Sequence, residues 1–271
     1  MTTMSSHIRS KLKTLQHLLP PKAVLTQPWL DTHGINRKLS RRYVQSGWLD
    51  RIGVGAFKRN GEEASWQAAL TAIQKQLNLP VHIGAKSALE LKGGSHYLKL
   101  GSNFEVFLFS PLRIRNLPKW FRDQNWGVHL TLIKTNFFSE NFKKGYSEVK
   151  LDNFTITVSS KERSIMELLY LIPKKQTWEE ANLIFENLTT LRPKLIQILL
   201  ENCSSIKVKR LFLFFAEKHN HQWFKKINLE NINLGKGDRL LYKGGIYEKK
   251  YRITVPKYLS SKENTDGSTT I

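Results

Sequence analysis

The chain has very little cysteine and no long apolar run. Cys203 is the single cysteine among 271 residues, so neither an internal disulfide nor a site built from several thiolates can form. No apolar stretch approaches the roughly 18 residues that a membrane-spanning helix needs. Residues 1–13 also lack the apolar segment of a secretory signal. We therefore expect a protein of the reducing cytoplasm that does not enter a membrane.

Acidic residues are scarce as well. The chain carries 22 Asp and Glu against 43 Lys and Arg, a net charge of +21 at pH 7. This excess favours a polyanionic partner, because each cation placed on a phosphate releases a counterion. Residues 1–60 hold 11 basic and two acidic residues, whereas residues 61–271 hold 32 basic and 20 acidic ones. We expect nucleic acid to bind the N-terminal segment, where the basic excess is densest.

The sequence also lacks a convincing catalytic or metal-binding constellation. His219-Asn220-His221 matches the letters of an HNH nuclease, but these residues sit at an expected helix end. Glu90-Leu91-Lys92 matches the E-x-K half of a restriction-type nuclease site. However, it falls in an expected short helix, and the paired aspartate that such a site has on a preceding strand is missing. The Gly235-x-Gly237 segment lacks the Lys-Ser/Thr ending of a phosphate loop. The histidines are scattered without metal-binding spacing, so we expect no enzyme, no metal and no cofactor.

Apolar spacing predicts three short helices in the N-terminal segment. The first covers residues 6–18 and ends before Pro20-Pro21, which cannot continue a helix. The second lies near residues 27–32. The third begins after Asn36, a typical N-cap residue, and runs to Ser46. Leu39 and Tyr43 of this helix are predicted to face inward.

A basic hairpin follows the three helices. Leu49 and Arg51 precede a Gly-Val-Gly turn and Ala56 and Lys58 follow it, which predicts a two-stranded hairpin. Three helices and a basic hairpin are typical of the winged helix-turn-helix, whose recognition helix enters the major groove. The alternative for the third helix is a solvated basic face. The candidate DNA-binding residues are Asn36, Arg37, Lys38, Ser40, Arg41, Arg42, Gln45, Arg51, Lys58 and Arg59.

The rest of the chain predicts a larger mixed α/β domain, which makes the whole fold α+β. Strands are expected at residues 81–84, 104–109, 128–133, 154–158, 240–242 and 250–255, and helices at residues 66–77, 86–92, 177–188, 193–200 and 207–219. Ser159-x-x-Glu162 reads as a capping box that opens a further helix. The aromatic residues Phe212, Phe214, Phe215 and Trp223 are expected in the core. We predict a DNA-binding domain over residues 1–60, an effector domain over 61–259 and a disordered tail over 260–271.

Several sequence blocks resemble one family. They are residues 47–57 (GWLDRIGVGAF), 65–70 (SWQAAL), 81–90 (VHIGAKSALE), 235–239 (GKGDR), 243–245 (KGG) and 250–256 (KYRITVP). Together they resemble the AbiEi-type antitoxins of bacterial type IV toxin–antitoxin systems, over about residues 6–258. The resemblance rests on the order and spacing of the blocks, since each block alone is weak.

The resemblance implies an N-terminal winged helix that represses its own operon at inverted repeats in the promoter. It also implies a C-terminal domain that counteracts a partner nucleotidyltransferase toxin, with or without direct contact. Two alternatives remain open from the sequence. One is a nuclease that acts through the second domain after docking on DNA, and the other is a ligand-sensing transcription factor without a toxin.

Overall fold

The computed structural model describes residues 20–93 and 105–260. The fold is mixed α/β, with an N-terminal winged helix-turn-helix and a larger C-terminal part, as the sequence predicts. The described residues form two compact units. The first takes residues from 1–83, 95–134 and 147–158, and the second takes residues from 84–94, 135–146 and 159–271. The predicted helix over residues 6–18 lies outside the described residues, and so does the predicted tail over residues 260–271 except for Ser260, which is buried and thus not part of a disordered tail.

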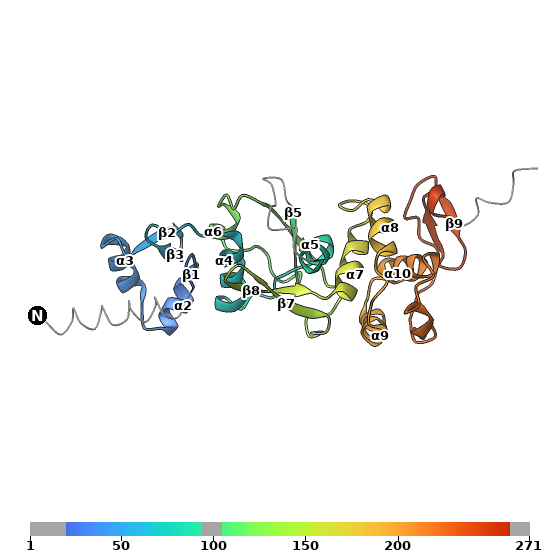
Figure 1. Cartoon of the computed structure of the whole chain (residues 1–271), viewed down its shortest axis with the longest axis horizontal. Helices are drawn as coiled ribbons and strands as arrows, with labels where there is room; N and C mark the ends of the chain where they lie inside the picture. Colours follow the sequence, from blue (N-terminus) through green and yellow to red (C-terminus); the bar gives the residue numbers. More distant parts are fainter. Residues whose placement is uncertain (1–19, 94–104, 261–271) are drawn as a thin grey trace, which may run out of the picture. The chain divides into compact units, whose positions relative to one another are not determined.

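The first unit begins with the winged helix-turn-helix (Figure 1). Its elements are β1 (Leu25–Thr26), α2 (Gln27–Thr32), α3 (Arg37–Gln45), β2 (Leu49–Gly53) and β3 (Ala56–Arg59). The three strands form an antiparallel sheet in the order β1-β3-β2. The predicted second and third helices and the hairpin are confirmed. Strand β1 was not predicted, because two residues carry no alternation that a pattern could detect.

Apolar residues from all five elements form the core of this part. Tyr43 of α3 is 2% exposed and Leu39 packs against the core, so the predicted inward face of the helix is confirmed. The hairpin turn is two residues long, because Gly53 pairs with Ala56 across it. Gly55 in the turn has φ +77°, which glycine adopts without steric cost. The core residues are Leu25, Leu30, Ile35, Tyr43, Leu49 and Phe57.

The remainder of the first unit is built on a five-stranded sheet in the order β6-β5-β4-β8-β7. Strand β4 pairs antiparallel with β5 and parallel with β8, and β5 pairs parallel with β6. Strand β7 was missed by the sequence pattern because it alternates weakly and keeps every second residue exposed. The elements are α4 (Trp66–Thr71), η1 (Ala72–Gln76), β4 (His82–Ile83), β5 (Glu105–Ser110), α6 (Lys119–Arg122), β6 (His129–Lys134), β7 (Tyr146–Leu151) and β8 (Phe154–Ser159).

Two glutamines of the π-helical turn η1 connect the two sheets of this unit. The Gln76 side-chain amide accepts from Thr26 N at 2.8 Å and donates to Val24 O at 2.7 Å. The Gln74 side-chain amide makes the same two kinds of bond with the backbone of Thr157 in β8, at 2.9 and 3.1 Å. Residues two apart on a helix do not face each other. Gln76 is therefore hydrogen-bonded to the three-stranded sheet, and Gln74 to the five-stranded sheet.

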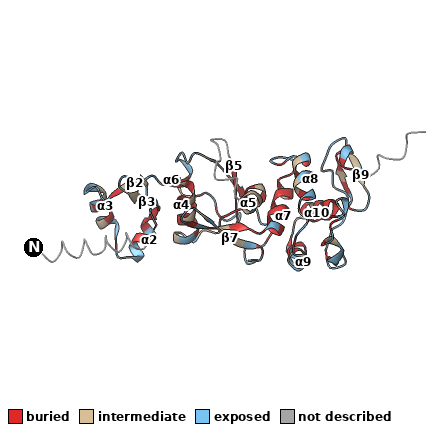
Figure 2. Cartoon of the chain, viewed as in Figure 1, coloured by how far each residue is buried: buried red, intermediate tan, exposed pale blue. Residues whose placement is uncertain are grey.

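The second unit is mainly helical, and its buried residues run along α7 and α10 (Figure 2). Phe212, Phe214, Phe215 and Trp223 are all buried, which confirms their assignment to the core. The predicted helices of this unit are confirmed with ends shifted by at most two residues. The elements are α5 (Ala85–Lys92), α7 (Lys161–Leu171), α8 (Trp178–Glu186), α9 (Pro193–Asn202), α10 (Ile206–Lys218), η3 (Phe224–Lys226), β9 (Ile246–Glu248), β10 (Ile253–Val255) and η4 (Lys257–Leu259).

Two sequence predictions in this unit are wrong. The predicted strand over residues 240–242 is not formed, because β10 takes β9 as its antiparallel partner. On its other side, among the described residues, β10 forms an isolated bridge at Arg239, and the Thr254 hydroxyl accepts from the N–H groups of Leu241 and Tyr242. The predicted capping box is not formed, since Ser160 rather than Ser159 is the N-cap of α7 and its side chain accepts from the N–H of Arg163, which is not a glutamate.

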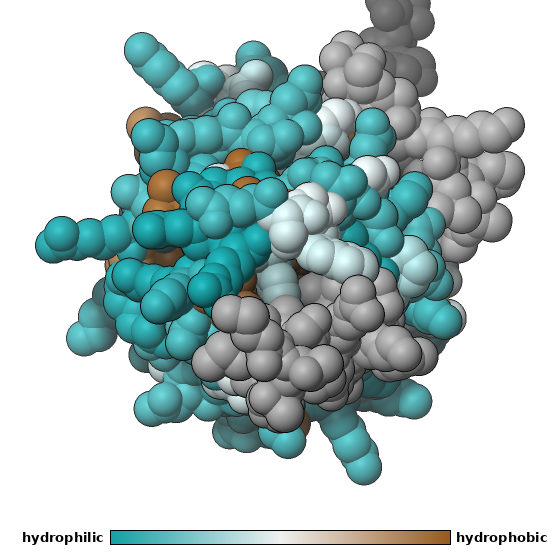
Figure 3. Space-filling model, turned by 90° about the vertical axis from the view of Figure 1, so that its left-hand side faces the viewer, coloured by the Kyte–Doolittle hydropathy of each residue, from teal (hydrophilic) through white to brown (hydrophobic). Residues whose placement is uncertain are grey.

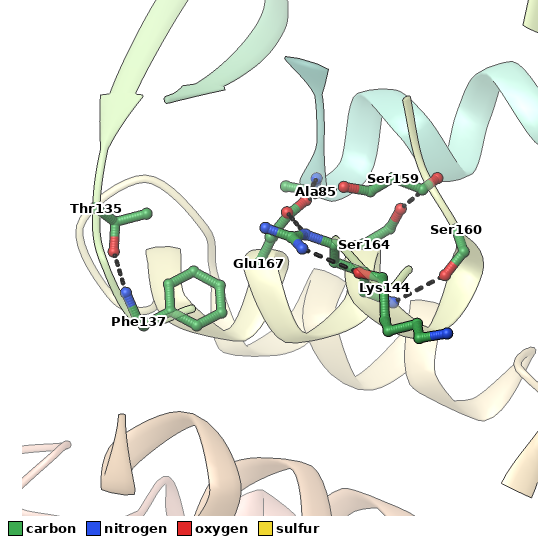
Figure 4. Close-up of polar contacts among 9 residues, drawn as sticks. Ala85, Thr135, Phe137, Lys144, Ser159, Ser160, Ser164 and Glu167 are labelled. Carbon is green, nitrogen blue, oxygen red and sulfur yellow. Dashed lines mark hydrogen bonds and ion pairs between the residues drawn. The ribbon is translucent and has the colours of Figure 1, made fainter. Parts of the chain in front are cut away.

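Ser159 belongs instead to a buried polar cluster centred on Glu167 (Figure 4). The Glu167 carboxylate accepts from Ser159 Oγ at 2.7 Å and from Ala85 N at 3.2 Å. It also forms an ion pair of 2.9 Å with Arg163, and both side chains are under 10% exposed. The Arg163 guanidinium donates to Lys144 O and lies 4.2 Å from the centre of the Tyr146 ring. Each buried charge is thus compensated by a partner and by hydrogen bonds, as burial demands.

A second ion pair places the predicted capping glutamate in another role. The Glu162 side chain is 4% exposed, and its oxygens accept from Arg192 Nε and Nη2 at 3.0 and 2.9 Å. Burial alone would raise the pKa of Glu162, but the side-chain and backbone hydrogen bonds from Arg192 outweigh it and lower the pKa to about 2.

Replacing Arg192 by alanine should destabilise the protein by about 1–3 kcal/mol at pH 7, because a buried carboxylate loses its two side-chain donors and keeps only the backbone N–H of residue 192. Since the folded-state pKa is depressed, the stabilisation is complete above the ordinary pKa of 4.5 and is lost as the pH falls toward 2. Thermal unfolding of both proteins between pH 3 and 7 should show a difference that narrows on acidification. A difference that is independent of pH would contradict this account.

Candidate nucleic-acid interface

Helix α3 presents its basic residues on one face. Arg37, Lys38, Arg41, Arg42 and Gln45 are all exposed. Because an α-helix turns by about 100° per residue, these five positions span roughly 140° of its circumference. The opposite side carries the buried Tyr43 and packs on the core. Figure 3 views the side of the molecule that carries α3 in Figure 1, and hydrophilic side chains, several of them extended into solvent, cover most of its described surface.

The buried amide of Gln27 fixes the angle between α2 and α3. Its Nε2 donates to Asp31 Oδ1 at 2.9 Å and to Ile35 O at 3.1 Å, which spans the turn. Its Oε1 accepts from Ser40 Oγ at 2.7 Å, which reaches the second helix. A buried amide with three satisfied hydrogen bonds holds the two helices in one arrangement.

Two predicted DNA-binding residues of α3 have structural roles. Ser40 is 2% exposed, and its hydroxyl is used by Gln27 and by the Arg37 carbonyl. We correct the prediction for Ser40, because a buried and hydrogen-bonded hydroxyl lies off the exposed face. Asn36 is exposed, but its side-chain oxygen accepts from Leu39 N at 3.0 Å as the N-cap. Its first role is therefore to begin the helix.

The wing has fewer fully exposed cationic side chains than the sequence predicts. Arg51 is exposed, with its guanidinium 6.0 Å from the centre of the Phe57 ring. Lys58 is half-buried and lies opposite Asp50 in the register of the hairpin. Arg59 forms an ion pair of 3.3 Å with Glu62. Arg51 is thus the most exposed of the three predicted wing cations.

An apolar residue at the wing tip was missed by sequence reasoning. Val54 is 87% exposed, the highest value among the large apolar side chains of the described residues. It lies in the turn between β2 and β3, next to Gly53, whose backbone approaches α6 closely. A Cβ on Gly53 would lie 2.7 Å from Trp120 Cβ. The hairpin that bears the wing tip therefore packs against α6 at Gly53.

The motifs set aside in the sequence have structural partners. His219 and His221 contact Asn182 Oδ1 and Phe185 O through their Nε2 atoms, at 3.0 and 2.8 Å. Burial raises the pKa of the Cys203 thiol to about 11. Within residues 20–93 and 105–260, no three His, Cys, Asp or Glu side chains gather as metal ligands. In the same residues no helix has the length and apolarity to cross a membrane.

A winged helix-turn-helix with a cationic second helix exposed to solvent defines a DNA-binding regulator. Two family models match the chain. "Transcriptional regulator, AbiEi antitoxin N-terminal domain" matches residues 8–100, and "Transcriptional regulator, AbiEi antitoxin, Type IV TA system" matches residues 103–256. The chain belongs to this AbiEi antitoxin family of type IV toxin–antitoxin systems.

Comparison with known proteins otherwise supports the fold. The chain is similar to the RV2827C protein from Mycobacterium tuberculosis, with a TM-score of 0.53 and 13% sequence identity. The match covers 91% of this chain and 90% of that one. No curated protein matches the chain. At this identity the structural match concerns the fold alone.

Proposed function

We propose that this protein represses its own operon and counteracts a partner nucleotidyltransferase toxin. Helix α3 would lie in the major groove at inverted repeats in the promoter, with Arg37, Lys38, Arg41, Arg42 and Gln45 toward base edges and phosphates. Arg51 and the wing would hold the adjacent backbone. The observation that carries the proposal is the single exposed face formed by these five side chains of α3. The described residues outside the winged helix-turn-helix would carry the antitoxicity, without catalysis by this chain.

DNA binding by this surface should depend steeply on salt. With about 6–10 phosphate contacts, affinity for the promoter should fall about 10³- to 10⁵-fold between roughly 50 and 200 mM salt, because released counterions drive the binding. Fluorescence anisotropy with a labelled promoter duplex measures this slope. A flat response would count against the assignment of the DNA surface.

The antitoxin role is tested in cells. Co-expression of this chain with the neighbouring nucleotidyltransferase gene should restore growth, whereas a regulator without a toxin would leave growth unchanged. Incubation of the purified protein with plasmid or transfer RNA and divalent metal should leave both intact. Cleavage there would point to the nuclease alternative.

A further inference from the structure

A buried arginine supports an exposed loop in the second unit. Arg210 of α10 is 1% exposed, and each of its hydrogen bonds among the described residues ends on a backbone carbonyl. The acceptors are Leu234 O at 2.9 Å, Gly235 O at 3.3 Å, Gly237 O at 2.8 Å and Arg252 O at 3.0 Å. The loop therefore turns its carbonyl oxygens inward, toward a guanidinium that forms no hydrogen bond with a carboxylate of the described residues.

The same geometry turns N–H groups outward. In a planar trans peptide the N–H points away from the preceding carbonyl oxygen. With the carbonyls of Gly235 and Gly237 on Arg210, the N–H groups of Lys236 and Asp238 point away from its guanidinium, and neither donates to an atom of the described residues. Gly235 and Gly237 both have positive φ, +64° and +75°. Backbone N–H groups that point outward from one such turn form a concave site for an anion.

The charges around the loop also favour an anion. Lys236 and Arg239 are exposed, and Arg252 pairs with Asp238 at 2.8 Å. Burial lowers the pKa of Arg210, and the nearby charges of Arg239 and Arg252 lower it further, whereas the Asp238 carboxylate and Tyr247 act in the opposite direction. The segment over residues 234–258 carries seven basic and two acidic residues. An anion bound here would relieve repulsion among these cations.

Exposed tyrosines lie beside the loop. Tyr247 is 45% exposed, and its hydroxyl donates to Asp238 Oδ1 at 2.8 Å, the atom that also accepts from Arg252 Nε. The shared carboxylate holds the ring next to the loop. Tyr247 pairs across the hairpin with Thr254, whose hydroxyl accepts from Tyr242 N at 3.0 Å, and Tyr242 is itself 40% exposed. A flat aromatic face beside a phosphate site is what single-stranded nucleic acids use for base stacking.

We propose that the loop over residues 235–239 and Tyr247 form a second nucleic-acid site, which binds a single strand. A phosphate would accept from the N–H groups of Lys236 and Asp238 and pair with the Lys236 and Arg239 side chains, and a base would stack on Tyr247. A duplex fits less well, because its bases are already stacked and cannot reach the ring. The site is separate in sequence from α3 and does not depend on operator binding.

The test uses the full-length chain with Arg41→Ala and Arg42→Ala as background, so that α3 contributes little. The probes are fluorescein-labelled oligouridylate and oligothymidylate of 12 nucleotides and a mixed-sequence duplex of the same length, measured by anisotropy. Tyr247→Ala should weaken single-strand binding about 5- to 150-fold, in line with the loss of one stacked base. Tyr247→Phe keeps the stacking ring and loses only the hydroxyl bond to Asp238, so it should weaken binding less than Tyr247→Ala does.

The second part of the test removes two positive charges from the loop. Lys236→Ala with Arg239→Ala should reduce the salt slope of single-strand binding by about 1.4, or about 0.7 per lost phosphate contact. Lys194→Ala with Lys225→Ala removes two exposed lysines from other elements and should leave Tyr247-dependent binding unchanged. Circular dichroism melting confirms that each variant folds.

Four results would overturn the inference. They are single-strand binding that is unaffected by Tyr247→Ala, stronger binding of the duplex than of either single strand, full displacement of the strand by millimolar inorganic phosphate, and loss of toxin rescue in a Tyr247→Ala chain whose single-strand binding is intact. The third would mark a site for free anions, and the fourth a protein-binding surface. Loss of promoter binding in the background variant concerns α3 and leaves this inference standing.

Discussion

Replacing Arg41 and Arg42 together by alanine should remove promoter binding and repression while the protein stays folded and still rescues cells from the toxin. Each lost contact to bases or phosphates should cost about 1–3 kcal/mol, so the pair should weaken binding at least about thirtyfold. Folding should persist because both side chains are exposed, and the helix is held by Tyr43 and by the Gln27–Ser40 hydrogen bond. A promoter-reporter assay and a toxin-rescue assay on the same variants measure the two functions.

The matched control is Lys194→Ala with Lys225→Ala, which removes the same charge from α9 and η3. It should repress as well as the parent chain. Full repression by the arginine variant would mean that the recognition helix is misplaced. Loss of rescue by a variant that is folded by circular dichroism would assign antitoxicity to α3 itself and remove the division of labour between the two parts.

The largest loss of stability should follow from Glu167→Ala. This change leaves the Arg163 guanidinium, 7% exposed, without its carboxylate, and it also leaves Ser159 Oγ and Ala85 N without their acceptor (Figure 4). Removing one member of a buried ion pair costs about 3–5 kcal/mol. Thermal and urea unfolding of the variant should show this loss directly.

Two comparisons make the stability result specific. Glu148→Ala breaks the exposed pair Lys75–Glu148, in which both side chains are about half exposed, and should cost under about 1 kcal/mol. Replacing both buried partners, with Glu167→Leu and Arg163→Met, should cost less than Glu167→Ala, because no unpaired charge is left in the interior. Equal losses in Glu167→Ala and Glu148→Ala would show that the buried cluster contributes no more than a surface pair.

The parts of the fold that were predicted from sequence are those whose apolar spacing is set by one local helix or hairpin. Helix α3 follows from Asn36, the spacing of Leu39 and Tyr43, and the glycine after its end. Strands β1 and β7 were missed for different reasons. Strand β1 is too short to have a pattern, and β7 has the weak alternation of a strand at the edge of its sheet.

Long-range partners explain the remaining errors. Ser159 and Ser160 are equivalent as N-cap residues in sequence, and only the position of Glu167 assigns Ser159 to the buried cluster. The anchoring of the loop over residues 235–239 by Arg210 bridges more than 20 residues, so no local pattern signals it.

Two of the wrong expectations for the candidate interface, those for Ser40 and Arg59, could have been avoided from the sequence. On a helical wheel Ser40 falls between Tyr43 and Val44, on the side that faces the core, so its burial follows from spacing. The partner of Arg59 is also visible in sequence, since Glu62 follows three residues later. The partial burial of Lys58 and the exposure of Val54 depend on the register of the hairpin, which sequence did not give in detail.

The two glutamines of η1 bear on where the chain can be divided. Strand β1 lies at the edge of its sheet, and the Gln76 amide occupies the N–H of Thr26 and the carbonyl of Val24 on that edge. A fragment that stops at residue 60 would keep every residue of α3 and the wing but expose this edge. An unprotected edge is a template for pairing with another copy. Self-association of such a fragment would therefore result from the exposed edge of β1 and would not indicate a natural dimer. A DNA-binding fragment should therefore end beyond η1.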